Sequence, residues 1–156
     1  AMLGVVVLLC AGIVYRYVIR PWTKEIHPLY AAKMLDSSDE FLRGDALMIL
    51  ALRRRSKVLE PIIKATRDES PYVREKALRA LANTSMHSQR VGDAIIKVLQ
   101  DKEAPVASTA FNAVVWFLGK SKAKKIMSPD GKKRSRKKMT EAVIKWWETN
   151  RKLYPK

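Results

Sequence analysis

The sequence predicts an all-α protein: a single N-terminal transmembrane helix followed by a short α-solenoid of about three helix pairs. Three observations predict this architecture. The first 15 residues carry no charge and are almost entirely apolar. Apolar residues then recur at helical spacing, in units displaced by 31 to 33 residues, across 36–119. A final segment, 140–156, holds two adjacent tryptophans on an amphipathic pattern that can close the stack.

The N-terminal segment has the composition of a membrane span. About 18–19 residues give about 28 Å of helix at about 1.5 Å per residue, close to the bilayer core of about 30 Å. Pro21 is expected to end this helix, and cations follow the segment while none precedes it. The positive-inside rule therefore places the N-terminus outside and the solenoid in the cytoplasm, as in a bacterial inner membrane. The residues expected in the anchor and at its interfaces are Leu3, Val7, Leu8, Ile13, Val14, Tyr15, Arg16, Tyr17, Arg20 and Trp22.

Small residues within the span, Gly4, Ala11 and Gly12, would let a neighbouring span pack closely. Other interpretations of this segment fit less well. A cleaved secretory signal would carry a basic region before the apolar run, which is absent here. A lipoprotein signal would need a small residue before Cys10, where the sequence has Leu9. A buried core helix would not be followed by this basic cluster, and one cysteine excludes an internal disulfide framework.

A short connector joins the span to the repeats. Residues 29–35 are expected to form a helical turn or two that caps the first repeat. Because the connector is short, the solenoid is expected to lie close to the membrane surface. The predicted boundaries are 1–22 for the anchor, 23–35 for the connector and capping helix, 36–119 for the repeats, 120–139 for a basic linker and 140–156 for the C-terminal helix.

The central repeat, Ser70–Gln100, predicts two amphipathic helices joined by a polar turn. Pro71 suits the first turn of a helix, because its missing N–H would be unpaired there. Asn83, Thr84 and Ser85 should end that helix, since short polar side chains compete for the backbone. The apolar stripes are Val73, Ala77, Leu78 and Leu81 in the first helix and Val91, Ile95, Val98 and Leu99 in the second.

Copies of these stripes lie on both sides of the central repeat, as a helix pair with two apolar faces requires. An acidic turn precedes each unit, and the small residue of the first helix stays small. The matching first-helix positions are Leu42, Ala46, Leu47 and Leu50, and then Val106, Ala110, Phe111 and Val114. The matching second-helix positions are Val58, Ile62 and Ile63.

The stretch DESPYVREKALRALA resembles the short HEAT-like repeats first described in phycobilisome lyases. The residues that carry the resemblance are Asp68, Val73, Arg74, Ala77 and Leu81, with Leu42, Arg43, Ala46 and Leu50 in the first repeat and Val106 and Ala110 in the third. It covers about residues 36–118 and departs from the family at Ala107, where an arginine is expected.

The resemblance implies an α-solenoid in which Arg43 and Arg74 pair with the acidic turn of their own or the next repeat. It implies little about function, because such repeats serve many unrelated roles. The lyase activity of some relatives is not carried over, since only structural repeat positions match.

The C-terminal region is strongly basic. Residues 120–156 hold 14 Lys or Arg and three acidic residues, a net charge of +11, while the other 119 residues contribute only +5. Three interpretations of this charge compete: solubility, phosphate binding to nucleic acid, and contact with anionic lipid or an acidic partner. The predicted anchor favours the third. The densest run contains Lys132, Lys133, Arg134, Arg136, Lys137 and Lys138.

The last helix is expected to begin with Thr140 as its N-cap. At least one of Trp146 and Trp147 should pack on the third repeat as a C-terminal cap. The other tryptophan is a candidate anchor for a partner, because tryptophan is favoured at the centres of interfaces.

No catalytic, cofactor-binding or metal-ligating residues are predicted. The two histidines, His27 and His87, are far apart in sequence, and no Cys-x-x-Cys pair or glycine-rich phosphate loop occurs. His27 follows the span, where a haem or pigment could be ligated, but an interfacial polar residue is the simpler interpretation.

The expected function is therefore that of a non-catalytic scaffold or accessory subunit of a larger membrane complex. Its expected partners are other subunits of that complex and anionic lipid headgroups, and no small-molecule substrate is expected. Two alternatives remain: a membrane-tethered adaptor that binds nucleic acid or ribosomes through the basic segment, and an enzyme of the bilin-lyase kind.

Overall fold

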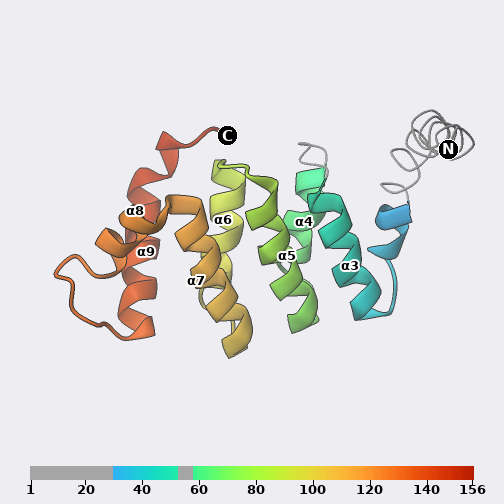
Figure 1. The fold of residues 1–156 in the computed structure, drawn as a ribbon, viewed down its shortest axis with the longest axis horizontal. Coiled ribbons are helices and arrows are strands. Elements are labelled where there is room, and N and C mark those ends of the chain that lie inside the picture. The colour runs from blue at the N-terminus through green and yellow to red at the C-terminus, as the bar shows by residue number, and fades with distance from the viewer. Residues whose placement is uncertain (1–29, 53–57) are drawn as a thin grey trace, which may run out of the picture.

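The computed structural model describes residues 30–52 and 58–156. Over these residues the protein is an elongated stack of helices (Figure 1), so the predicted all-α class is confirmed. The helices are α3 (Glu40–Ala51), α4 (Leu59–Ala65), α5 (Pro71–Thr84), α6 (Gln89–Val98), α7 (Ala104–Leu118), α8 (Lys120–Met127) and α9 (Arg136–Asn150), followed by the 3₁₀ turn η3 (Arg151–Leu153). Residues 30–34 are also helical.

The predicted membrane anchor, residues 1–22, lies outside the described residues. Among the helices that the structure does describe, none combines the length and the apolar character needed to cross a bilayer.

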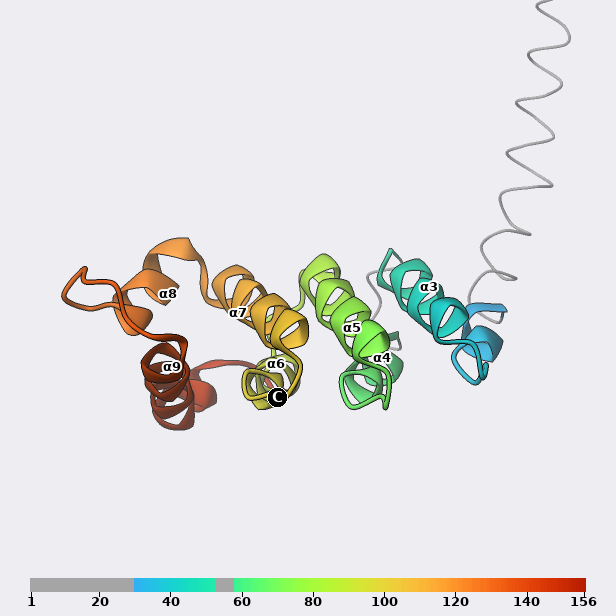
Figure 2. The same cartoon turned by 90° about the horizontal axis from the view of Figure 1, so that it is seen from below.

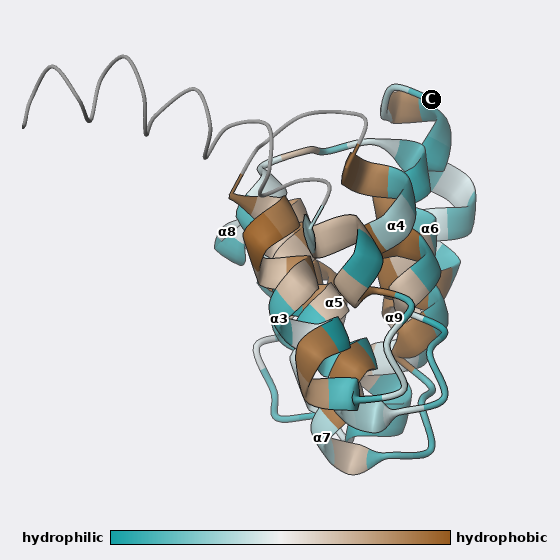
Figure 3. Ribbon diagram, turned by 90° about the vertical axis from the view of Figure 1, so that its right-hand side faces the viewer, coloured by the Kyte–Doolittle hydropathy of each residue, from teal (hydrophilic) through white to brown (hydrophobic). Residues whose placement is uncertain are grey.

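The helices form two layers (Figure 2). One layer contains α3, α5 and α7 side by side, with α3 packed on α5 and α5 packed on α7. The second layer contains α4, α6 and α9, and here α4 packs on α5 while α6 packs on α7 and α9. Viewed end-on from the side of residue 30, hydrophobic residues mark both α3 and α4 (Figure 3).

The apolar stripes form the core between the layers. The small residue shared by the three repeats is fully buried in each, as Ala46, Ala77 and Ala110, which lets neighbouring helices approach closely. The largest fully buried side chains are Leu47, Ile62, Val73, Leu78, Leu81, Val91, Ile95, Val106, Val114 and Val143.

Three stripe positions are less buried than the sequence pattern predicts. Ile63 and Phe111 are half-buried, and Leu42 is 42% exposed. The positions equivalent to Leu42 are Val73 and Val106, which are buried because α3 and α5 precede them in the stack.

The ends of α5 follow the predicted signals. Pro71 occupies its first turn, and the Ser70 hydroxyl accepts a hydrogen bond from the Val73 N–H at 3.4 Å. The helix ends at Thr84, and Ser85 then adopts a left-handed conformation with φ of 56°.

The basic segment differs from the expected linker over 120–139. Residues 120–127 form α8, whose Ala123 and Met127 are spaced four apart and are both buried. Helix α9 begins at Arg136, and its N-cap is Ser135, whose hydroxyl accepts from the Lys138 N–H at 3.4 Å. The prediction that Thr140 caps this helix is wrong, because Thr140 lies buried inside α9.

The C-terminal end of the stack closes around Trp147. Its side chain is 4% exposed and lies against α6, and its indole N–H donates to the Asp93 carboxylate at 2.8 Å. Its ring centroid lies 5.5 Å from that of Phe117 and 5.3 Å from that of Tyr154. The chain then returns to the start of α6, where the Gln89 N–H donates to the Pro155 carbonyl at 2.7 Å.

Gly92 is the position on α6 that admits the Trp147 ring. A Cβ atom added there would lie 2.2 Å from the Trp147 Cη2 atom. Gly92→Ala is therefore expected to lower the free energy of unfolding by about 1–3 kcal/mol through overpacking, although alanine favours helices by about 1 kcal/mol over glycine. Urea denaturation followed by circular dichroism measures the change.

Gly44→Ala provides the matched control. A Cβ atom at Gly44 would lie 2.6 Å from the Tyr72 Cε1 atom, but Tyr72 is only half-buried and its ring can move. We expect this variant to lose less stability than Gly92→Ala, and the reverse order would contradict the account of the Trp147 contact.

Candidate interaction surfaces

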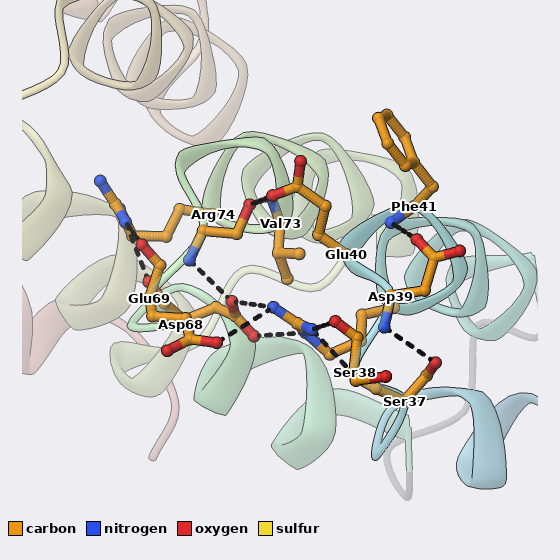
Figure 4. A network of polar contacts seen from close by, with 11 residues as sticks. Ser37, Ser38, Asp39, Glu40, Phe41, Asp68, Glu69, Val73 and Arg74 are labelled. Atoms are coloured by element: carbon orange, nitrogen blue, oxygen red, sulfur yellow. Dashed lines mark hydrogen bonds and ion pairs between the residues drawn. The ribbon is translucent and has the colours of Figure 1, made fainter.

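Arg43 links the first repeat to the second through hydrogen bonds to Asp68, Ser37 and Ser38, three residues that Figure 4 shows within one polar network. Its Nε and Nη2 atoms donate to the two carboxylate oxygens of Asp68, at 3.1 and 2.9 Å. Its Nη1 atom donates to the carbonyls of Ser37 and Ser38, at 2.9 and 3.2 Å. The guanidinium thus ties the turn before its own helix to the turn before the next one.

Arg74 repeats this arrangement one unit along the chain. It donates to both carboxylate oxygens of Asp101, at 2.7 and 2.9 Å. Its Nη1 atom donates to the carbonyls of Asp68 and Glu69, at 2.9 Å each. Each arginine therefore contacts its own acidic turn through carbonyls and the next turn through a carboxylate. The sequence left open whether each arginine pairs with the turn of its own repeat or with that of the next, and the structure shows contacts with both.

The residue at this position of each turn also accepts a hydrogen bond from the N–H group two residues later. Asp68 accepts a hydrogen bond from the Ser70 N–H at 2.9 Å, and Asp101 accepts one from the Glu103 N–H at 2.9 Å. In the first turn Ser37 takes this role and accepts from the Asp39 N–H at 3.1 Å. At the arginine position of the third repeat Ala107 is buried. We refer to the Arg43–Asp68 and Arg74–Asp101 pairs as the arginine ladder.

Both aspartates of the arginine ladder have a lowered pKa. Burial alone raises the pKa of Asp68, but hydrogen bonds from Arg43 and from the Ser70 N–H outweigh burial. At Asp101, hydrogen bonds from Arg74 and from the Glu103 N–H likewise outweigh burial and lower the pKa. Both carboxylates are therefore ionised throughout the neutral range and accept bidentate hydrogen bonds.

This lowering predicts a specific acid sensitivity. The contribution of Asp68 and Asp101 to stability is fully present above the unfolded-state pKa of about 3.9 and is lost as the pH falls through their lower folded-state values. The melting temperature should therefore fall steeply below about pH 4. Thermal unfolding over a pH series measures this, and the Asp68→Asn/Asp101→Asn variant should show a shallower slope below that pH. An unchanged acid slope in that variant would contradict the prediction.

A half-open groove of about 930 Å³ lies beside the ladder. The ion pair between Arg90 and Glu60 lies at its rim. Residues from the 30–36 segment, α3, α4, the turn after α4, α5 and α6 line the groove: Ala32, Leu35, Asp36, Arg43, Glu60, Pro61, Ile63, Lys64, Ala65, Arg67, Asp68, Val73 and Arg90. The sequence did not predict this groove, because its walls come from segments up to about 60 residues apart.

The cationic run forms a second surface at the opposite end of the stack. Among its six cations Arg134 is partly exposed and lies 3.4 Å from Asp130. The others, Lys132, Lys133, Arg136, Lys137 and Lys138, are exposed. We call α8, the 128–135 loop and the first turn of α9 the basic end.

The two tryptophans of α9 are placed differently. Trp147 is buried in the aromatic cluster, whereas Trp146 is half-buried and the Lys122 ammonium lies 4.6 Å from its ring centroid. Asp93 also contacts Arg151, at 2.6 Å, a pairing across 58 residues that no sequence signal indicated. The anchor residues predicted between Leu3 and Trp22 lie outside the described part of the chain.

The described residues contain no group of three or more His, Cys, Asp or Glu side chains placed to hold a metal ion. His87 stacks on Trp116, with ring centroids 4.8 Å apart. The arrangement thus offers two surfaces for contact, one grooved and one cationic.

A family model described as HEAT repeats matches residues 30–115. No curated protein matches the chain significantly.

Proposed function

The chain belongs to the HEAT-repeat family, and on that premise we propose that it is a non-catalytic, membrane-anchored accessory subunit of a larger membrane complex. The HEAT-repeat domain is a generic module for protein interaction. In this proposal the N-terminal segment packs against neighbouring spans, and the solenoid docks a partner subunit on the cytoplasmic side.

The observation that carries the proposal is the groove beside the arginine ladder. Arg43 and Asp68 line it and hold each other through two hydrogen bonds. Their side chains are only 10% and 17% exposed. A wall that is already fixed loses little conformational freedom when a partner binds, so more of the contact energy remains for affinity.

The chemistry of the groove favours one kind of occupant. Its floor is apolar, with Leu35, Ile63 and Val73 among its lining residues. Lys64 and Arg67 are exposed at its rim, and within the described part of the chain neither lies in a salt bridge. The groove therefore suits a segment of a partner subunit that carries apolar side chains next to acidic ones.

A crosslinking experiment tests this proposal. The full chain is expressed in its native membrane with a photo-crosslinking amino acid in place of Ala32, an exposed groove residue. We expect one membrane protein to be crosslinked and to co-migrate with the chain in a defined detergent-solubilised assembly. A monomer on native mass analysis would contradict the proposal.

Charge variants make the test specific to the groove. Lys64→Glu/Arg67→Glu should reduce the crosslink yield about ten-fold or more, because like charges would then face the acidic partner. Lys97→Glu is the control, since Lys97 is an exposed cation on α6 that does not line the groove. Equal loss in the control and the groove variant would argue against docking at this site.

A further inference from the structure

We propose that the basic end binds the surface of an anionic lipid bilayer, so that the solenoid contacts the membrane at its C-terminal end as well as through its anchor. This inference rests on the proposed function for the second contact. It names the partner of the basic end as lipid headgroups rather than protein or nucleic acid.

Charge is distributed unequally along the stack. The turns before α3, α5 and α7 are acidic and include Asp39, Asp68 and Asp101. Helix α9 begins instead with Arg136, Lys137 and Lys138, and its first turn holds no acidic residue. These cations lie at the positive end of the helix dipole, so the dipole does not compensate them.

These cations are held on folded structure. Helices α8 and α9 pack on each other, with Ala123 and Val143 fully buried between the elements of this end. The loop that joins them bends through Gly131 with φ of 71° and a Ser128 hydroxyl bond to the Lys132 carbonyl at 2.5 Å. The cationic side chains are thus displayed on one end of the stack rather than along a free tail.

The basic end lies far from the end of the stack at which the predicted anchor would attach. Figures 1 and 2 both place α8, the 128–135 loop and the start of α9 at the end of the stack remote from residue 30. A chain attached to the bilayer through the segment before residue 30 and through the basic end would lie along the membrane surface. Its groove would then lie close to partners that are held in the same membrane.

The aromatic rings near the basic end argue against single-stranded nucleic acid as its ligand. Proteins that bind single strands add aromatic platforms on which bases stack. The aromatic rings near the basic end already face cations of this protein: the Arg136 guanidinium lies 6.0 Å from the Phe111 ring centroid, and Lys122 covers Trp146. An anionic lipid surface requires only accessible cations, each worth roughly a five-fold factor in partitioning near the membrane.

The test uses the full chain in lipid nanodiscs. A donor dye is attached at Pro129→Cys, an exposed loop position, in a Cys10→Ser background, and the acceptor is a headgroup-labelled lipid. We expect energy transfer to rise when neutral lipid is replaced in part by anionic lipid, and to return to the neutral value in concentrated salt.

Two matched variants carry the same change in charge. Lys132→Glu/Lys133→Glu/Lys137→Glu should abolish the rise in energy transfer with anionic lipid. The expected loss is roughly 100-fold or more in the ratio of membrane-bound to unbound basic end. Arg79→Glu/Lys97→Glu/Lys102→Glu, at exposed positions outside both the groove and the basic end, should retain the rise. An equal effect of both variants would overturn the inference.

Other outcomes separate this inference from the proposed function. A chain that floats with neutral vesicles but shows no rise overturns lipid binding by the basic end and leaves the anchor standing. A chain that binds anionic vesicles without floating on neutral ones supports the basic end and overturns the anchor. Binding to a short RNA with no lipid-dependent rise would replace lipid with nucleic acid and overturn the inference.

Discussion

Replacing Trp147 with alanine is expected to lower the free energy of unfolding by about 3–5 kcal/mol. The ring is 4% exposed and contacts Phe117 and Tyr154 in the aromatic cluster. Its removal would leave a cavity against Gly92, which has no side chain to fill it. Most small domains are stable by only about 5–15 kcal/mol, so this loss should be visible as a large shift in the urea midpoint measured by circular dichroism.

The neighbouring tryptophan is the control for this prediction. Trp146 is half-buried, with Lys122 over its ring, so Trp146→Ala should cost less than half as much. Trp147→Phe should be intermediate, because it keeps much of the ring and loses the hydrogen bond to Asp93, a bond to a charged group worth about 1.5–3 kcal/mol. If Trp146→Ala proved the more damaging change, Trp147 would not be the residue that closes the stack.

Replacing Arg74 with methionine is expected to cost about 3–5 kcal/mol. The change would leave the Asp101 carboxylate, whose side chain is only 10% exposed, without its cation and would free the carbonyls of Asp68 and Glu69. Arg79→Met is the surface control. Arg79 is 61% exposed and pairs with Glu75 one turn away, so its removal should cost at most about 0.5 kcal/mol.

A double variant distinguishes the stability lost with the ion pair itself from the stability lost by leaving Asp101 charged without a partner. Arg74→Met/Asp101→Asn removes both charges, so it should be more stable than Arg74→Met alone. Urea denaturation of the four members of this cycle gives the coupling energy directly. If the second substitution added its own full cost instead, the unpaired Asp101 charge would not be what destabilises Arg74→Met.

Much of the fold follows from the apolar period of the sequence. The stripe Val73, Ala77, Leu78 and Leu81 repeats on both sides because each helix pair has faces that only a neighbour can bury, and all four of these side chains are at most 1% exposed. The pairing of Arg43 and Arg74 with acidic turns was also expected, because the resemblance to HEAT-like repeats implies it.

The C-terminal end was less predictable because its signals compete. Residues 120–127 hold four lysines that suggest a charged linker, but lysine favours helices and only Ala123 and Met127 are needed for the buried face. Thr140 followed by Glu141 imitates a helix start, while the true cap, Ser135, lies within the cationic run. The contact of Gln89 with Pro155 joins positions far apart in sequence, which no local pattern can indicate.

The arginine ladder also couples neighbouring repeats to each other. Asp68 accepts from Arg43 through its side chain and from Arg74 through its backbone carbonyl, so a displacement of this one turn alters both guanidinium contacts. A rotation between the first and second repeats is therefore expected to be felt at the junction of the second and third, and the curvature of the stack should change over several units together rather than at one hinge.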